Sequence, residues 1–384
     1  MWRHVASNAL TFFVVALFLL GGVILWGSKE YQAEGPLTQA ICLQVKSGAS
    51  FASVSRDLEG QGAVSNGRIL RIGADYADKT RQLKAGSFLV PEQASMSEIV
   101  DIVTRGGASS CGTEVVYRIG VLRNDVLVRE LDPATGRFVE RAKFRPDEEE
   151  APAIYADVLE GADTRLRVSV AEGATSWAVV EGLKSIDVLD GTVAEVPVEG
   201  ALAPDSYAFV KGTPRAELLA QMQDKQAQIL QAAWDSRSDR TPLQSAQEAL
   251  ILASIIEKET GIAEERGQVA SVFVNRLNQG MKLQTDPTVI YGITKGEGSL
   301  GRGLRRSELR AATPYNTYVI DALPPTPIAN PGRASIQAAL NPEDTDYIFF
   351  VADGTGGHAF SVTLADHNAN VAKWRAIEAA RQNQ

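Results

Sequence analysis

Residues 10–26 (LTFFVVALFLLGGVILW) form an apolar run without a single charged side chain. A helix over this run is at the lower limit of length for crossing roughly 30 Å of hydrocarbon. Arg3 and His4 precede the run, and Trp26 ends it with an aromatic ring suited to the membrane interface. We therefore expect a transmembrane helix over residues 9–28. By the positive-inside rule, residues 1–8 are then cytoplasmic and the rest of the chain lies outside the cytoplasm.

A cleaved signal peptide is the alternative reading of this run. Its apolar segment would be shorter, and a small-x-small cleavage site would follow it. Here the sequence continues as Gly27-Ser28-Lys29-Glu30-Tyr31, without a good A-x-A pattern. An uncleaved anchor is therefore the favoured interpretation.

The remaining chain, roughly 350 residues, is long enough for two or three domains with ordinary cores. Its acidic balance, a formal net charge of -9, argues against a nucleic-acid-binding role. Cys42 and Cys111 could form a disulfide in an oxidising compartment, or they could remain a free buried pair. Neither cysteine lies in a motif for a nucleophile or a metal ligand.

Hydrophobic periodicity predicts an α+β fold with several parts. A short polar linker is expected at 29–38, and the order strand, helix, helix, strand, helix is expected at 39–108. Residues 109–166 are predicted to be a β-rich insertion, and helices should dominate 215–278. The individual elements expected are strands at 43–45, 88–90, 114–119, 125–131 and 137–144, helices at 50–58 and 95–104, and a turn at 132–136.

A strand at 167–170 followed by a helix at 176–186 repeats the pattern of residues 43–58. This repetition suggests a second copy of the same small unit.

One helix stands out because its ends and its apolar face can both be read from the sequence. Thr241 and Gln244 fit a capping box with Pro242 at the first helical position, and Gly261 fits a left-handed glycine after the last turn. The helix is thus expected to lie between Thr241 and Gly261.

Leu252, Ile255 and Ile256 form an apolar stripe on this helix, and the next position on the stripe is Glu259. Glu257 is about 200° around the helix from Glu259, at roughly 100° per residue, and should point away. Both partial burial and the negative end of the helix dipole would raise the pKa of Glu259, as a general acid requires. The ordinary alternative is a solvated carboxylate, or one paired with a nearby cation such as Lys258 or Arg266.

Stretches rich in polar and loop-forming residues follow at 284–292, 313–318, 323–332 and 350–360. With IIEKET at 255–260 and VASVFVNRL at 269–277, they closely resemble the endolytic murein transglycosylase (MltG or YceG-like) family. The match is nearly continuous from about residue 250 to 368, and weaker at 199–207 and 83–88.

This resemblance implies an enzyme anchored in the bacterial inner membrane, with its catalytic domain in the periplasm. It would cut nascent peptidoglycan strands internally and leave 1,6-anhydro-N-acetylmuramyl ends. It also implies a LysM-like subdomain at 39–108, a YceG-like catalytic domain at 167–384, and Glu259 as the acid. Residues 111–166 depart from the family pattern, being longer and richer in strands.

Sugar binding by planar polar groups and aromatic faces makes several residues candidates for a glycan groove. Asp286 could orient sugar hydroxyls or could simply form a turn before Pro287. No H-E-x-x-H or similar motif accompanies the two histidines after residue 26, so neither a metal nor a cofactor is expected. The candidate substrate-binding residues are Gln284, Thr285, Asp286, Tyr315, Asn316, Tyr318 and His358.

Two other functions remain open. A non-catalytic peptidoglycan-binding scaffold would recruit peptidoglycan synthases, which are possible partners of an enzyme as well. A hydrolytic muramidase would cut the same bond but leave reducing ends.

Overall fold

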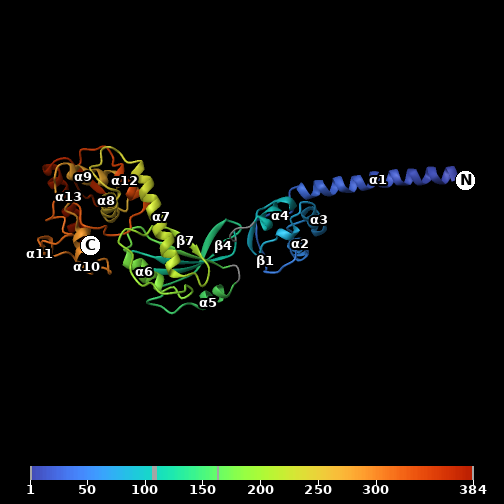
Figure 1. The fold of residues 1–384 in the computed structure, drawn as a ribbon, viewed down its shortest axis with the longest axis horizontal. Coiled ribbons are helices and arrows are strands. Elements are labelled where there is room, and N and C mark those ends of the chain that lie inside the picture. Colours follow the sequence, from blue (N-terminus) through green and yellow to red (C-terminus); the bar gives the residue numbers. More distant parts are fainter. Residues whose placement is uncertain (1, 106–109, 162–163, 383–384) are drawn as a thin grey trace. The chain divides into compact units, whose positions relative to one another are not determined.

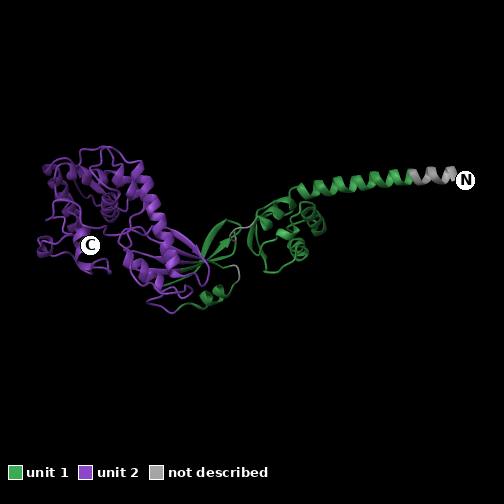
Figure 2. Cartoon of the chain, viewed as in Figure 1, with its two compact units in different colours: residues 1–115, 127–144, 151–165 green, residues 116–126, 145–150, 166–384 purple. Residues whose placement is uncertain are grey.

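The structure, a computed structural model, describes residues 2–105, 110–161 and 164–382, with side chains from residue 11 onward (Figure 1). It is a mixed α+β fold in two compact units. The first unit contains residues 1–115, 127–144 and 151–165, and the second contains residues 116–126, 145–150 and 166–384 (Figure 2). The side chains of the predicted cytoplasmic segment 1–8, and the predicted domain boundary at 108–109, lie outside the described residues.

Helix α1 (Trp2–Gln32) contains the predicted membrane segment. Within the described part of the chain, Thr11–Gln32 is the one helical stretch long and apolar enough to cross a membrane, with a mean hydropathy of 2.2. The predicted linker at 29–38 differs from what is found. No proline interrupts the helix before Pro36, so it continues to Gln32, and Leu37 is already buried in the core that follows.

Residues 41–104 have the predicted order of strand, helix, helix, strand and helix, and these elements pack around one core. The two strands are antiparallel, with Leu43 opposite Phe88. Leu43, Leu58, Leu70 and Ile99 are buried there. The elements are β1 (Ile41–Val45), α2 (Phe51–Gly60), α3 (Gly67–Tyr76), the 3-10 turn Thr80–Gln82, β2 (Gly86–Val90) and α4 (Met96–Thr104).

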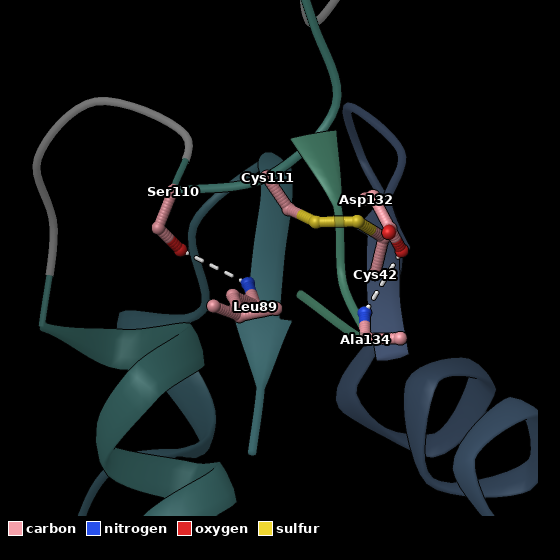
Figure 3. Close-up of a disulfide and its surroundings, with 6 residues drawn as sticks. All are labelled: Cys42, Leu89, Ser110, Cys111, Asp132 and Ala134. Carbon is pink, nitrogen blue, oxygen red and sulfur yellow. Dashed lines mark hydrogen bonds between the residues drawn. A yellow bond between two sulfur atoms is a disulfide. The ribbon is translucent and has the colours of Figure 1, made fainter. Parts of the chain in front are cut away.

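Cys42 and Cys111 form a disulfide, which decides between the two alternatives left open by the sequence (Figure 3). Their Cα atoms are 5.7 Å apart, and 69 positions separate them in the chain. Two hydrogen bonds support this link: the Cys111 amide donates to the Ser87 carbonyl at 3.0 Å, and the Leu89 amide donates to the side-chain Oγ of Ser110 at 2.9 Å. The segment after α4 is therefore held against both β2 and, covalently, β1.

A five-stranded sheet has the order β5 (Arg137–Phe144), β4 (Asn124–Asp132), β3 (Thr113–Ile119), β6 (Arg165–Val170), β7 (Ser206–Phe209). Its strands in the predicted insertion match the prediction to within two residues, and Asp132 accepts from the Ala134 amide in the predicted turn. The prediction of a second copy of the small unit was wrong, because the strand at 165–170 belongs to this larger sheet. The helices between these strands are α5 (Ala153–Glu160) and α6 (Ser176–Lys184).

The rest of the second unit is dominated by helices, as expected, around a core that includes Leu252, Phe273 and Ile336. A short antiparallel hairpin, with Phe350 opposite Phe360, packs beside it. The elements are α7 (Arg215–Asp235), α8 (Ala246–Glu259), the 3-10 turn Ala263–Glu265, α9 (Arg266–Asn278), α10 (Asp286–Thr294), α11 (Arg306–Leu309), α12 (Arg333–Leu340), β8 (Phe349–Ala352), β9 (His358–Ser361) and α13 (Leu364–Gln382).

The ends predicted for helix α8 were wrong at both termini. The N-cap is Ser245, whose Oγ accepts from the Glu248 amide at 3.2 Å, so the helix begins after Thr241 and Gln244. Ser245 and Glu248 have the same i, i+3 spacing as Thr241 and Gln244, four residues later in the chain. Here the Glu248 side chain accepts from the Gln244 amide at 2.6 Å. Gly261 is not left-handed; instead Thr260 ends the helix in an extended conformation with φ -138°.

Candidate active site

Helix α8 positions Glu259 as its last residue, next to a buried apolar face. Leu252, Ile255 and Ile256 are completely buried, which confirms the predicted stripe. Glu259 itself is half-buried at the end of that stripe. The Thr260 amide closes the helix by donating to the Ile256 carbonyl at 3.2 Å. The helix thus holds a carboxyl group at the edge of the core, at the negative end of the helix dipole.

Glu257 points to a different neighbour, as predicted. Its Oε2 accepts from the Gly332 amide at 3.0 Å and from Ser335 Oγ at 2.7 Å. Both donors lie at the start of α12, where helical amides have no partner within the helix. The Glu257 carboxylate therefore links α8 to the start of α12.

Thr285 is the direct partner of Glu259, its Oγ1 donating to Glu259 Oε1. Thr285 is buried just before α10, and its own amide donates to Thr317 Oγ1 at 3.0 Å. The preceding residue, Gln284, has φ +53° and donates its amide to the Thr317 carbonyl at 3.1 Å. A left-handed turn at a non-glycine residue thus presents Thr285 to the acid.

Burial is the largest influence on the pKa of Glu259 and raises it above its ordinary value. The carboxylate of Asp286 acts in the same direction, because a second negative charge nearby disfavours ionisation. The hydrogen bond from Thr285 and the charges of His358 and Arg276 act in the opposite direction. The net shift is upward, so Glu259 keeps its proton to a higher pH than a solvated glutamate does.

Arg276 is a site residue that the sequence analysis missed. It is buried, and it donates from Nε to the Ile348 carbonyl at 2.7 Å and from Nη1 to the Leu283 carbonyl at 2.5 Å. Burial lowers its pKa and the charge of Glu259 raises it. Arg276 connects α9, the segment leading to Thr285, and the segment leading to β8. The sequence signal that could have identified Arg276 is a single cation within the mostly apolar segment 269–277.

Asp286 and Tyr318 lie together beside this acid. Asp286 is the first residue of α10, and its Oδ1 accepts from the Tyr318 hydroxyl at 2.7 Å. Burial and the neighbouring carboxylate raise the pKa of Tyr318, which keeps its hydroxyl a donor. Asp286 thus begins a helix instead of forming a turn before Pro287, and its carboxylate lies near Glu259.

Tyr315 and Asn316 differ in how far they are available to a ligand. Tyr315 is partly buried against Tyr291, with ring centroids 5.2 Å apart, and its hydroxyl pairs with Thr326 Oγ1 at 2.8 Å. Asn316 is fully buried, and its Nδ2 donates to the Glu308 and Ala311 carbonyls at 3.1 and 2.8 Å. Its amide group therefore stabilises the loop from within.

His358 begins β9 and is bound to Glu265. Its Nδ1 is 2.7 Å from Glu265 Oε2, and its backbone amide donates to Glu265 Oε1 at 2.9 Å. The imidazole also packs edge-on against Phe350, with centroids 5.3 Å apart. Across the described residues, no cluster of three His, Cys, Asp or Glu side chains is arranged to hold a metal ion.

A cleft of about 650 Å³ adjoins this group of residues. Glu259 does not line it, but Lys258 and Pro287 do, and these are the chain neighbours of Glu259 and Asp286. The cleft therefore begins where α8 ends and α10 starts. Its other walls come from residues 120–124, from α6 and from the loop 296–302.

A family model described as the YceG-like family matches residues 43–373, which is most of the chain. The chain belongs to this family. Its curated relatives named endolytic murein transglycosylase include one from Bacillus subtilis, 38% identical over 172 residues, covering 45% of this chain and 46% of that protein. Another is from Streptococcus pneumoniae, 26% identical over 389 residues, covering 96% of this chain and 65% of that protein.

The YceG-like chain thus spans less than two thirds of the length of these relatives. A crystal structure of a YceG-like protein from Listeria monocytogenes is 26% identical and matches with a TM-score of 0.40. That match covers 86% of this chain and 99% of the Listeria chain.

The hydroxyl of Thr285 should set the upper pH limit of any acid catalysis by Glu259. The Thr285→Val variant removes the hydrogen bond that favours the charged carboxylate, so the pKa of Glu259 should rise further. A general acid works only while protonated, and the alkaline limb of the rate profile should therefore move to higher pH. Thr285→Ser keeps the hydroxyl and should retain the parental limb. A limb that moves to lower pH in Thr285→Val would contradict this account.

Proposed function

We propose that this YceG-like protein is an endolytic murein transglycosylase, a lyase acting on peptidoglycan glycan strands. It would cleave the β-1,4 bond between N-acetylmuramic acid and N-acetylglucosamine within a strand, leaving a 1,6-anhydro end and terminating elongation. The relatives named endolytic murein transglycosylase support this activity. The observation that carries it is Glu259, a half-buried carboxyl group with a raised pKa, whose chain neighbour Lys258 lines a cleft.

A single carboxyl group suffices for this reaction. Glu259 protonates the glycosidic oxygen as the bond to C1 breaks, and the C6 hydroxyl of the same sugar then attacks C1. Glu259 accepts the proton of that hydroxyl, so it acts first as acid and then as base. Because the nucleophile belongs to the substrate, the cost of ordering a separate water is avoided. Ordinary glycosidases instead need a second carboxylate.

The surrounding residues would have distinct tasks in this mechanism. Thr285 orients the carboxyl group of Glu259, and Asp286 with Tyr318 lies close enough to order sugar hydroxyls. Tyr315 and His358 would contribute ring surfaces to the sugars. Gln284 and Asn316 are the remaining predicted substrate-binding residues. Since Asn316 is buried and already bonded to the backbone, we assign it to holding the loop that carries Tyr315 and Tyr318.

The other parts of the chain fit a protein that works at a membrane surface. We propose that α1 is a single-pass anchor in the bacterial inner membrane, with a cytoplasmic N-terminus and a periplasmic catalytic domain. The disulfide supports an oxidising compartment. We further propose that residues 39–108 are a LysM-like subdomain that contacts glycan, and that a synthase is a possible partner.

Product analysis tests the proposal. The full chain in detergent should convert uncrosslinked glycan strands to fragments with anhydro ends. A muramidase would add one water at each cut, and mass spectrometry separates the two products. Reducing ends would indicate hydrolysis, and uncut strands that stay bound would indicate a scaffold; either result would overturn the assignment.

A further inference from the structure

The cleft is lined by Lys258 and Pro287, the chain neighbours of Glu259 and Asp286, and it extends away from the catalytic group. Nothing in the proposed chemistry uses it. Helix α10 connects the two regions. Its first residue, Asp286, lies beside the acid, and one face of the helix then lines the cleft. The lining residues of that face follow the i, i+3, i+4, i+7 spacing: Pro287, Ile290, Tyr291 and Thr294.

From Pro287 to Thr294 the helix covers about 10 Å along its axis, at 1.5 Å per residue. This distance exceeds the length of a single pyranose ring. A glycan whose scissile bond lay at Glu259 would therefore have further sugars over this face. Tyr315 packs against Tyr291 on this helix but does not itself line the cleft.

Among the described residues, two aromatic residues line the cleft, Trp177 and Tyr291, and the mechanism uses neither of them. Trp177 lies in the first turn of α6 and is half-buried, so part of the indole remains accessible. The turn that carries it is fixed: Thr175 accepts from the Ala178 amide at 3.2 Å and donates to the Gly296 carbonyl at 2.7 Å. The first turn of α6, which carries the indole, is thus fixed by a hydrogen bond to the loop 296–302.

The surroundings of Trp177 combine apolar surface with polar groups. Val121 and Leu122, in the turn between β3 and β4, line the cleft and are 39% and 79% exposed. Lys258 also lines it, with its ammonium group 3.4 Å from the Gly173 carbonyl. Sugars present C–H faces to aromatic rings and hydroxyl edges to polar groups, and this wall offers both.

We propose that the cleft is a distal glycan subsite in which Trp177 provides the stacking platform for a sugar remote from the scissile bond. This inference rests on the proposed function. The occupant is the same polysaccharide strand, because the cleft shares α8 and α10 with the catalytic group. A platform at a distance from the acid would favour long strands over short ones, and so would favour internal cuts.

The test compares strand binding in full-length chains made inactive by Glu259→Gln. Adding Trp177→Leu, which keeps apolar volume but removes the ring, should weaken binding of long uncrosslinked strands about tenfold. Binding of a tetrasaccharide should change much less. The matched control is Trp374→Leu, on α13 and outside the cleft lining, which should leave both affinities unchanged.

Equal affinity with and without Trp177→Leu would overturn the proposal, as would an equal loss in the control. If Trp177→Leu fails to fold, the Trp177→Phe variant tests the proposal by a second measurement, tryptophan fluorescence. Strand binding should change the tryptophan fluorescence of the Glu259→Gln chain, and Trp177→Phe should abolish that change while retaining most of the affinity. A fluorescence change that persists unaltered in Trp177→Phe would also count against the platform.

The two hypotheses fail in different ways. If the parental chain releases no anhydro ends, the proposed function fails, whereas the binding comparison can still be read. If the parental chain cuts strands and Trp177→Leu binds them normally, the distal subsite alone is wrong.

Discussion

Replacing Glu259 by glutamine should abolish the release of anhydro ends, with a loss in rate of about 10³-fold or more. Glutamine preserves the shape of the side chain and can still accept the hydrogen bond from Thr285. It cannot donate a proton to the glycosidic oxygen or take one from the C6 hydroxyl. The measurement is the rate of anhydro-end formation, with strand binding measured in parallel. Binding should be preserved, because the variant keeps the groove intact.

The matched control for this substitution is Glu264→Gln, an exposed residue in the 3-10 turn that follows α8. It should retain parental activity. If Glu259→Gln cut strands at the parental rate, Glu259 would not be the acid, and the proposed reaction would need another catalytic residue. The parental rate should also decline above the pKa of Glu259, since only the protonated form can act as the acid.

Replacing Arg276 by methionine should have the next largest effect, on stability and activity together. The variant leaves the Ile348 and Leu283 carbonyls without their buried donor, and each unsatisfied group costs on the order of 1–3 kcal/mol. We expect the free energy of unfolding to drop by about 2–4 kcal/mol. Because the cation also lowers the pKa of Glu259, the remaining activity should extend to higher pH.

Urea denaturation and a pH–rate profile of the same variant check both parts. Arg375→Met, at an exposed position on α13, is the matched control and should change neither. Arg276→Lys retains the charge, so it should restore the pH profile more fully than the stability. An Arg276→Met variant as stable as the parent would show that these two hydrogen bonds do not contribute as argued.

The parts of the fold that follow from local periodicity were predictable. The strands around Leu43, Phe88 and Val128, and the stripe that ends at Glu259, depend on residues close together in the chain. The start of α8 was misplaced because Thr241 and Ser245 both make acceptable caps, and only tertiary packing selects between them. The second copy of the small unit failed because strand pairing is non-local and a strand-then-helix pattern does not identify its sheet.

The site residues divide in the same way. Glu259 could be found, since its signal was a break in its own helix pattern. Thr285 and Asp286 were named as polar groups suited to binding sugars, and the structure brings both next to Glu259. Arg276, Thr317 and Trp177 were not found, because each depends on contacts with segments far away in sequence. A buried arginine that bonds two carbonyls looks, in sequence, like any other cation on a helix.

The last turn of α8 turns three consecutive side chains toward three different surroundings. Glu257 binds the start of α12, Lys258 lines the cleft, and Glu259 meets Thr285. An insertion or deletion within this tripeptide would disturb all three at once, whereas a substitution would disturb only one. A substitution of Lys258 should therefore alter the wall of the cleft while leaving the contacts of Glu257 and Glu259 in place.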